Sequence, residues 1–449
     1  MTQGSATGDT EQESDGHSTT AKVAPHLFLV LDADRLEDGG RRWSLADVDE
    51  VVFVRAEAYA ESRTGRTLTL GLPGKTLSGR HARLRRVRGE WELEDLGSRN
   101  GTFLLEQRLS RSTVIQDAQF FEMARFFFMV RSGPAATEQS LLQALDPRVI
   151  ASVQALFQVA VSSVPILIQG ETGTGKEVHA RAAHEASRRA GRFVAVNCGA
   201  LPATMVEAQM FGHVRGAFTG AVRDEPGLVR MATGGTLFLD EIADLGPSAQ
   251  AALLRVLQER EVLPIGGRIP VPVDLRIVSA THRDLDAEVR EGRFRDDLLA
   301  RLRGYEHLLS PLRHRRSDLG QLAAAIVKEA LPTGRLALAP AAARALLKYD
   351  YPYNVRELRQ ILLAAAALSG EAPIAVGHLP ARVQNPALQR KATPLLDEEK
   401  IDPELRARLV EQLTAHQGNV AAVARAMSKA PAQIHRWMKR NGLDPADYR

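Results

Sequence analysis

Cysteine is nearly absent from this sequence, which has a single one, Cys198, among its 449 residues. One cysteine excludes a disulfide within the chain and a cysteine-rich zinc site. This usage is typical of proteins in a reducing compartment, so we expect a cytoplasmic protein.

Long apolar segments are missing as well. Residues 1–22 contain no Val, Ile, Leu, Phe, Trp or Tyr, so they lack the apolar core of a signal peptide. The most apolar run, Phe120 to Val130, is interrupted by Glu122 and Arg125. It is also much shorter than the roughly 20 residues that span a bilayer. We expect no membrane partner, and we predict a buried strand over this run.

An excess of one charge is also lacking, because 58 Lys and Arg nearly balance 54 Asp and Glu. The net charge therefore does not predict a nucleic-acid partner, and only a local basic patch would support one. The length predicts two to four domains, at roughly 100–200 residues per domain.

The pattern of apolar and polar residues changes along the sequence, which predicts a multidomain protein. Residues 26–131 hold short runs of alternating apolar and polar residues, which predict an all-β domain. Over residues 146–384, strand-like and helical stretches alternate, as in an α/β domain with a parallel sheet. Residues 400–449 are helical in character. The remaining segments are a disordered N-terminus, 1–25, and two linkers, 132–145 and 385–399.

The segment "ILIQGETGTGKE", residues 166–177, contains an apolar strand, a glycine-rich turn and the start of a helix. Such a turn points backbone N–H groups at phosphate oxygens, while Lys176 and the helix dipole add positive charge. We predict an ATP site, with a glycine-rich loop that binds no nucleotide as the alternative. Glu177 departs from the general motif, which has Ser or Thr there. The predicted nucleotide contacts are Gly170, Glu171, Thr172, Gly173, Thr174, Gly175, Lys176 and Glu177.

A second acidic motif supports the ATP site. "GGTLFLDEI", residues 234–242, is an apolar strand that ends in Asp240 and Glu241. Acidic residues at the carboxyl end of such a strand lie where phosphates bind. We predict that Asp240 holds Mg²⁺ and that Glu241 polarises the attacking water.

"GAFTGA", between these two motifs, resembles the signature loop of sigma-54-dependent activators, also called bacterial enhancer-binding proteins. The resemblance implies a AAA+ ATPase with a helical lid over residues 146–384, and a loop that contacts sigma-54 RNA polymerase. Its glycines permit a tight, mobile loop with an aromatic ring and a hydroxyl at the tip. The alternative is a hairpin whose phenylalanine packs into the core. The implied partner-binding residues are Gly216, Ala217, Phe218, Thr219, Gly220 and Ala221.

Other segments resemble the same family. Glu177 is the residue that the family usually carries after the lysine. "FVAVNCGAL" (193–201) implies that Asn197 holds Glu241 in an inactive position, and "RIVSATHRDL" (276–285) places Thr281 at the first sensor. "FRDDLLARL" (294–302) implies arginine fingers, Arg295 and Arg301, that reach a neighbouring subunit's ATP, although Arg295 also suits a plain surface ion pair. "YPYNVRELRQ" (351–360) implies that Arg356 contacts nucleotide.

Three positions depart from the family pattern. His282 stands where Asn is usual, Tyr353 replaces a usual Gly, and Leu263-Pro264 replaces an aromatic and charged sequence in the second pore loop. We expect these changes to affect the rate of hydrolysis and its coupling to movement.

"LSGRHARL" (77–84) and "EDLGSRNGTFL" (94–104) resemble a forkhead-associated (FHA) domain, a β-sandwich that binds phosphothreonine. The implied phosphopeptide contacts are Ser78, Arg80, Ser98, Arg99 and Asn100, whose hydroxyl and guanidinium groups suit a phosphate. Leu72 stands where the family has a phosphate-contacting arginine, and Lys75 is a candidate replacement. A structural or protein-interaction module is the alternative.

The final segment, residues 409–443, predicts three helices arranged as a helix-turn-helix. From Arg425 to Arg440 there are five Lys or Arg and no acidic residue. This is a local basic patch, which the nearly balanced net charge of the whole chain does not reveal. The segment resembles the Fis-type DNA-binding domain, with a basic capping bundle as the alternative. The predicted contacts with enhancer DNA are Gln433, His435, Arg436, Lys439 and Arg440.

Together these segments predict an FHA-regulated sigma-54 activator that assembles into a hexameric ring, with a heptamer as the alternative. Two other functions remain open. A different AAA+ machine, such as an unfoldase or helicase loader, would share the ATP site without needing "GAFTGA". A phospho-regulated DNA-binding repressor would need no ATP hydrolysis.

Overall fold

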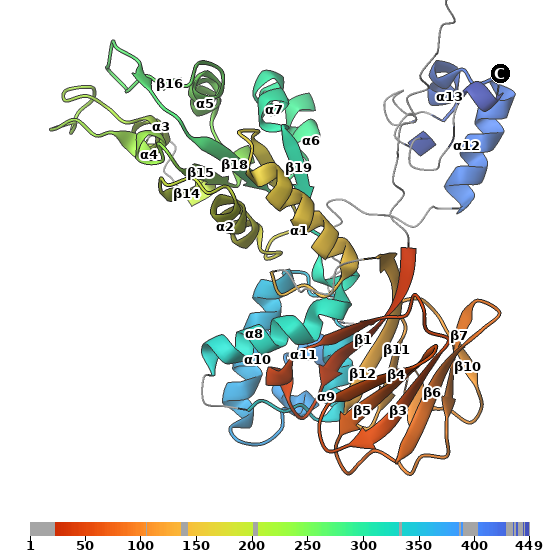
Figure 1. Ribbon diagram of the computed structural model, residues 1–449. Coiled ribbons are helices and arrows are strands. Elements are labelled where there is room, and N and C mark those ends of the chain that lie inside the picture. Colours follow the sequence, from red (N-terminus) through yellow and green to blue (C-terminus); the bar gives the residue numbers. More distant parts are fainter. Residues whose placement is uncertain are drawn as a thin grey trace, which may run out of the picture. The chain divides into compact units, whose positions relative to one another are not determined.

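A computed structural model gives the fold of the chain (Figure 1). It describes residues 23–104, 106–135, 142–200, 205–331, 335–385, 388, 403–427, 434, 437–438, 443 and 445–448. The chain divides into two compact units, Met1–Thr393 and Pro394–Arg449. Within the described residues, no helix is both long and apolar enough to cross a bilayer.

The first unit begins with a β-sandwich of two six-stranded sheets. The β1 sheet has the order β2-β1-β12-β11-β8-β9, and the β3 sheet has the order β10-β7-β6-β3-β5-β4. Neighbouring strands are antiparallel except β3 and β5, which are parallel. The strands are β1 Val23–Asp32, β2 Arg41–Ser44, β3 Glu50–Ala56, β4 Ala60–Thr64, β5 Thr67–Pro73, β6 Arg80–Val87, β7 Glu90–Asp95, β8 Thr102–Leu104, β9 Gln107–Arg108, β10 Thr113–Ile115, β11 Phe120–Met123 and β12 Phe126–Pro134.

The apolar run Phe120 to Val130 is buried as predicted, but it forms a hairpin rather than one strand. It belongs to β11 and β12, which pair in the register Phe121 to Phe128. The turn falls at Ala124, whose φ of +55° lies in the left-handed region. Phe128 packs against Phe53 and Phe121, with ring centroids 5.0 and 5.4 Å apart. This aromatic group joins the two sheets.

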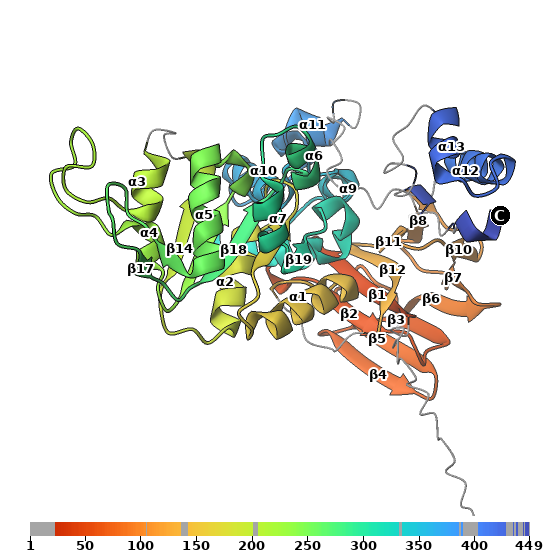
Figure 2. The same cartoon turned by 90° about the horizontal axis from the view of Figure 1, so that it is seen from above.

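The α/β part that follows has the predicted parallel sheet, in the order β14-β15-β18-β13-β19. Figure 2 shows helices on both sides of it. Its elements are α1 Pro147–Ala160, β13 Ile166–Gln169, α2 Lys176–Ala186, β14 Phe193–Asn197, α3 Val206–Phe211, α4 Gly227–Met231, β15 Thr236–Asp240, α5 Pro247–Glu259, β16 Glu261–Val262, β17 Val271–Pro272, β18 Arg276–Thr281, α6 Leu285–Arg290, α7 Asp296–Leu302 and β19 Tyr305–Leu308.

A helical lid completes the first unit, and it packs on the β-sandwich. Its helices are α8 Leu319–Ala330, α9 Pro340–Lys348, α10 Asn354–Ser369 and α11 Ala381–Gln384. One hydrophobic cluster contains both lid residues and residues of β1 and β12. The β1 sheet is therefore covered on both faces, by the β3 sheet and by the lid.

Arg276 at the start of β18 is almost fully buried, and no carboxylate of the described residues pairs with it. Its guanidinium donates to four carbonyl oxygens at the end of α1 and in the loop after it, those of Val159, Ala160, Ser162 and Val164. Helix ends leave such carbonyls without helical partners. Burial lowers the pKa of Arg276 to about 10, so the side chain stays charged at neutral pH.

The second unit contains α12 Pro403–Ala415, α13 Val420–Ala426 and a short 3₁₀ turn, Pro445–Tyr448. Leu409, Leu413, Val423 and Ile434 form its core. The predicted DNA contacts, Gln433, His435, Arg436, Lys439 and Arg440, lie outside the described residues, so the helix-turn-helix stays a prediction.

Replacing Arg276 with Met should destabilise the α/β part, because the four carbonyls would lose a buried charged donor. We expect the free energy of unfolding to fall by about 3 kcal/mol. A urea titration of the full chain measures this, with the exposed Arg230→Met as the control. An unchanged midpoint for Arg276→Met would mean that water replaces the guanidinium without cost.

Candidate functional site

The loop between β13 and α2 has the backbone of a phosphate loop. Gly173 and Gly175 have φ angles of +81° and +101°, in the left-handed region that favours glycine. A Cβ on Gly173 would also lie 2.2 Å from the carbonyl oxygen of Tyr353. Glycine is therefore required at Gly173 both by the turn and by the closeness of the lid.

Lys176, the first residue of α2, places its ammonium group inside this site. Nζ donates to the carbonyl oxygen of Gly170 at 3.1 Å and lies 3.7 Å from Oε1 of Glu241. The side chain is buried. Its positive charge is therefore held between the loop and the acidic end of β15, where phosphate would meet it.

Asp240 and Glu241 stand together at the carboxyl end of β15. Glu241 has a φ of +50°, a conformation that costs energy for a residue with a side chain and that clusters at functional sites. Burial and the neighbouring charge of Glu241 raise the pKa of Asp240, and Lys176 opposes this shift. Two crowded carboxylates suit Mg²⁺, which prefers oxygen ligands and would relieve their repulsion.

Glu241 is held by His282, at the position where the resemblance implies Asn. Nδ1 of His282 lies 2.7 Å from Oε2 of Glu241, and the backbone N–H of His282 donates to the same oxygen at 3.4 Å. The preceding residue, Thr281, is buried and its carbonyl oxygen accepts from Gly170 N–H at 3.2 Å. The carboxyl end of β18 thus contacts both the phosphate loop and the proposed base.

Asn197 lies beside Asp240 in the sheet but has other partners. Its Oδ1 accepts from the N–H groups of Gly199 and Ala200, at 3.0 and 3.2 Å. Among the hydrogen bonds of the described residues, none joins Asn197 to Glu241. The expected Asn197–Glu241 contact is not formed in this structure, and the regulatory role of Asn197 stays a prediction.

The lid and the segment before it close the site with contacts that the motifs do not predict. Glu171 forms a two-pronged ion pair with Arg313, at 2.7 and 2.8 Å, and accepts from Asn354 Nδ2 at 3.1 Å. Burial alone would raise the pKa of Glu171, but these hydrogen bonds outweigh it and the pKa is lowered. Arg315 donates to the carbonyl oxygen of Thr174 at 3.1 Å. Arg356 also lies beside the loop, with its Cβ 3.0 Å from the position of a Cβ on Gly173.

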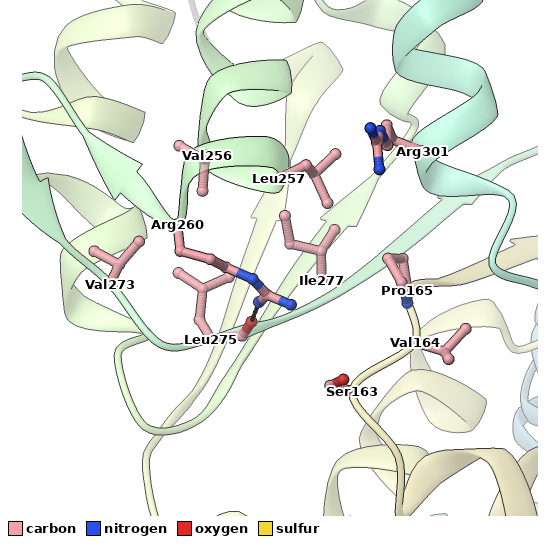
Figure 3. A pocket seen from close by; sticks show the side chains of 10 residues that line it. All are labelled: Ser163, Val164, Pro165, Val256, Leu257, Arg260, Val273, Leu275, Ile277 and Arg301. Carbon is pink, nitrogen blue, oxygen red and sulfur yellow. Dashed lines mark hydrogen bonds between the residues drawn. The ribbon is translucent and has the colours of Figure 1, made fainter.

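The two predicted arginine fingers have different surroundings. Arg295 forms an exposed ion pair with Asp297, at 2.7 Å, as the alternative interpretation expected. Arg301 on α7 makes no hydrogen bond or ion pair to any described residue. It lines a pocket of about 280 Å³ that Arg260 also lines, together with apolar side chains of α5 and β18 (Figure 3). Neither arginine contacts residues 170–177 of its own described chain, so action on a neighbouring subunit remains the prediction for both.

The "GAFTGA" segment forms an exposed loop, as predicted. Gly216 and Gly220 have φ angles of +81° and +102°, and the N–H of Gly216 donates to Ala221 at 2.9 Å. Phe218 is 43% exposed, and its ring lies against His213 rather than in the core. The segment between β16 and β17 contacts this loop, since Val214 N–H donates to Ile265 at 3.1 Å. The two loops therefore form one projection from the α/β part.

The predicted phosphopeptide residues are brought to neighbouring loops of the sandwich. Arg80 and Arg99 are exposed, and the hydroxyl oxygen of Ser78 accepts from Arg99 N–H at 3.1 Å. Asn100 Nδ2 donates to the carbonyl oxygen of Thr76 at 2.7 Å. The side chains of Arg80 and Arg99 are thus both accessible to solvent.

Ser98 and Leu72 face the interior instead. The hydroxyl of Ser98 donates to Asp95 at 2.7 Å and accepts from Gly101 N–H at 2.9 Å. Ser98 is buried and its hydroxyl supports the loop in this structure, so its contact with phosphate stays a prediction. Leu72 belongs to the sandwich core, and it leaves the phosphate-contacting position of β5 without an arginine.

Comparisons with known proteins agree with this architecture. The sigma-54 interaction domain family matches residues 142–307, the AAA+ ATPase lid domain matches 313–395, and the FHA domain matches 63–123. HoxA, the hydrogenase transcriptional regulatory protein of Cupriavidus necator, is 35% identical over 371 residues, which cover 80% of this chain and 74% of HoxA. The chain belongs to the sigma-54-dependent transcriptional regulators.

A second relative and a solved structure are also similar to this chain. The acetoin catabolism regulatory protein of Cupriavidus necator is 39% identical over 88% of the chain, which spans 60% of that relative's length. The crystal structure of NtrX from Brucella abortus in complex with ADP has a TM-score of 0.50 and 30% identity, over 68% of this chain and 70% of NtrX. The predicted FHA, AAA+ and lid folds are confirmed.

Replacing His282 with Ala should free the carboxylate of Glu241 from its position. We expect kcat for ATP hydrolysis to fall roughly 10- to 100-fold, because misplacing a catalytic group by about 1 Å has that effect. The Kd for ATP should stay within about twofold, since His282 has no contact with the phosphate loop. Steady-state hydrolysis and equilibrium binding separate the two quantities. An unchanged kcat would show that His282 does not orient Glu241.

Proposed function

We propose that this regulator is an ATP-driven activator that remodels sigma-54 RNA polymerase from the closed to the open promoter complex. The main support is the contact of Glu241 with two residues beside the phosphate loop. Its carboxylate lies 3.7 Å from Nζ of Lys176 and 2.7 Å from Nδ1 of His282. The same α/β part carries the exposed Phe218 loop. The proposed site for hydrolysis and the proposed surface for a partner therefore belong to the same α/β part of the chain.

In the proposed reaction Lys176 binds the β- and γ-phosphates, and it gives up its contact with Glu241 to do so. Glu241, held by His282, then polarises the water that attacks the γ-phosphate. Asp240 would hold Mg²⁺, which when bound neutralises charge on the phosphates. Thr281 and Arg356 flank the nucleotide from β18 and from the lid.

Assembly into a ring, as a hexamer or heptamer, would bring Arg295 and Arg301 to the ATP of the neighbouring subunit. Arg301 is unpaired within the described residues and lines a surface pocket, so its guanidinium group is available for a neighbouring subunit. Hydrolysis would then move the loop that carries Phe218 and Thr219 against sigma-54.

The FHA sandwich would sense the signal, and the C-terminal segment would bind the enhancer DNA. The exposed Arg80 and Arg99 suit a phosphothreonine peptide, although the loss of an arginine at Leu72 weakens the site and keeps a protein-interaction role open. The basic segment from Arg425 to Arg440 would bind enhancer DNA through a Fis-type helix-turn-helix. We place the protein in the cytoplasm, because its partners are there.

Two substitutions separate nucleotide binding from hydrolysis. Lys176→Ala should lose ATP binding, because the loop loses the buried ammonium group that lies between Gly170 and Glu241, where the phosphates would bind. Glu241→Ala should bind ATP and turn it over at least 100-fold more slowly, the range expected for loss of a general base. Equilibrium binding and phosphate release measure both. Hydrolysis by Glu241→Ala at the parent rate would exclude Glu241 as the base.

The loop substitution Thr219→Ala tests the partner. We expect the parent to convert sigma-54 RNA polymerase to open complexes with hydrolysable ATP only, and Thr219→Ala to fail while its ATPase rate stays within about threefold. Thr64→Ala on the exposed strand β4 is the matched control. Hydrolysis without promoter opening by the parent would favour a different AAA+ machine, and an absence of hydrolysis would favour a DNA-binding repressor.

A further inference from the structure

The outer face of the β1 sheet is apolar, which an isolated sandwich would not tolerate. Along β1, Leu27 and Leu29 belong to the sandwich core, while Phe28 and Val30 belong to the cluster formed with the lid. All four are fully buried. Strands buried on both faces have continuous apolar sequences rather than alternating ones, which accounts for "HLFLVLD" and "FFFMV".

The lid fits this face closely, backbone against backbone. A Cβ on Gly320, near the start of α8, would lie 2.0 Å from the carbonyl oxygen of Val30. Leu36 N–H donates to Leu336 at 3.1 Å, and Leu338 N–H donates to Ala33 at 2.6 Å. Such contacts require one fixed orientation of the sandwich on the lid.

Ion pairs at the edge of the interface fix the same orientation. Arg344 on α9 donates to both oxygens of Glu122, at 2.8 and 2.5 Å, and Glu122 is buried. Lys348 lies 2.8 Å from Glu106. Glu122 is the charge that interrupts the apolar run in the sequence, and its partner lies 222 residues away in the lid.

A chain of buried polar contacts continues from the sandwich to the phosphate loop. Arg131 on β12 donates to the carbonyl oxygen of His314 at 2.6 Å and lies 3.3 Å from Asp146. Asp318 accepts from the N–H groups of Leu145 and Asp146, at 2.7 and 2.8 Å. Arg315, three residues before Asp318, reaches Thr174 in the phosphate loop.

We propose that the FHA sandwich is a fixed part of the ATPase lid, and that its state is transmitted to the nucleotide through Arg131, the segment 145–146 and residues 313–318. The proposal rests on the proposed ATP site. It implies that a phosphopeptide bound by the sandwich and ATP bound by the loop influence each other's affinity by the same factor. A sandwich joined by a flexible tether would give no such coupling.

Gly320→Ala tests the interface between the sandwich and the lid, because the direction of its effect on thermal stability depends on whether that interface is formed. In an open helix Gly→Ala is stabilising, but here the added methyl group meets the backbone of β1. We expect a lower thermal midpoint and at least roughly fivefold weaker ATP binding, the lower end of measured couplings between sites. Gly377→Ala, where no atom lies within 4 Å of the added Cβ, is the matched control and should change neither.

Arg131→Met tests the polar contacts that link the sandwich to the phosphate loop. It also tests the coupling if Gly320→Ala fails to fold. Arg131 has no contact with the phosphate loop, yet we expect ATP binding to weaken at least roughly fivefold, with Arg230→Met as the control. Parent-like ATP binding by a folded Arg131→Met would overturn the proposal.

The failure of the proposed function is a separate result. If the parent chain itself binds no ATP, the ATP site is wrong, and hydrogen exchange then tests the coupling. Faster exchange of amides 170–176 in Arg131→Met would support the coupling, and unchanged exchange would overturn it.

Discussion

The arrangement of the first unit depends on the hydrogen bonds that two buried charged residues, Asp318 and Arg315, make to backbone groups of distant segments. Both side chains are almost fully buried, and burial raises the pKa of Asp318 to about 6 even though Arg315 acts in the opposite direction. Replacing either residue with an apolar one would leave the backbone groups that it bonds without a partner, at a cost of about 1–3 kcal/mol. Each residue also holds a different part of the chain: Asp318 holds the segment that leaves the sandwich, and Arg315 holds the phosphate loop.

This arrangement changes how the modules of the regulator are understood. The sequence has a composition boundary near residue 132, which suggests a signal domain joined by a linker. The structure instead gives the β1 sheet and the lid a common core. Removing the sandwich would expose the apolar residues of α8 that pack against β1, so we expect the α/β part and lid to aggregate without it.

Local motifs predicted the local structure well. The phosphate loop, the Asp240-Glu241 pair and the exposed loop around Phe218 each lie within a few consecutive residues, and backbone geometry fixes their form. The parallel sheet followed from the alternation of strands and helices. The apolar run at 120–130 was correctly expected to be buried, but its turn at Ala124 has no glycine to mark it.

Contacts between distant segments could not be predicted in the same way. Arg313 lies 142 residues from Glu171, and Arg315 lies 141 residues from Thr174. The hydroxyl of Ser98 would suit a phosphate contact. Only the fold shows that this hydroxyl donates a hydrogen bond to Asp95. His282 departs from the family pattern in the sequence, but its bond to Glu241 depends on the register of β15 and β18, which the sequence does not show. The one available signal for the lid interface was the continuous apolar sequence of β1 and β12.

A double-substitution cycle between Arg131 and Arg315, measured as ATP affinity of the full chain, tests the central connection most directly. Independent sites give additive losses, whereas members of one network do not. If the sandwich acts on the phosphate loop through Arg315, then Arg131→Met should weaken ATP binding in the parent but have little further effect in Arg315→Met. Fully additive losses would contradict this connection and leave the sandwich and the nucleotide site as neighbours without communication.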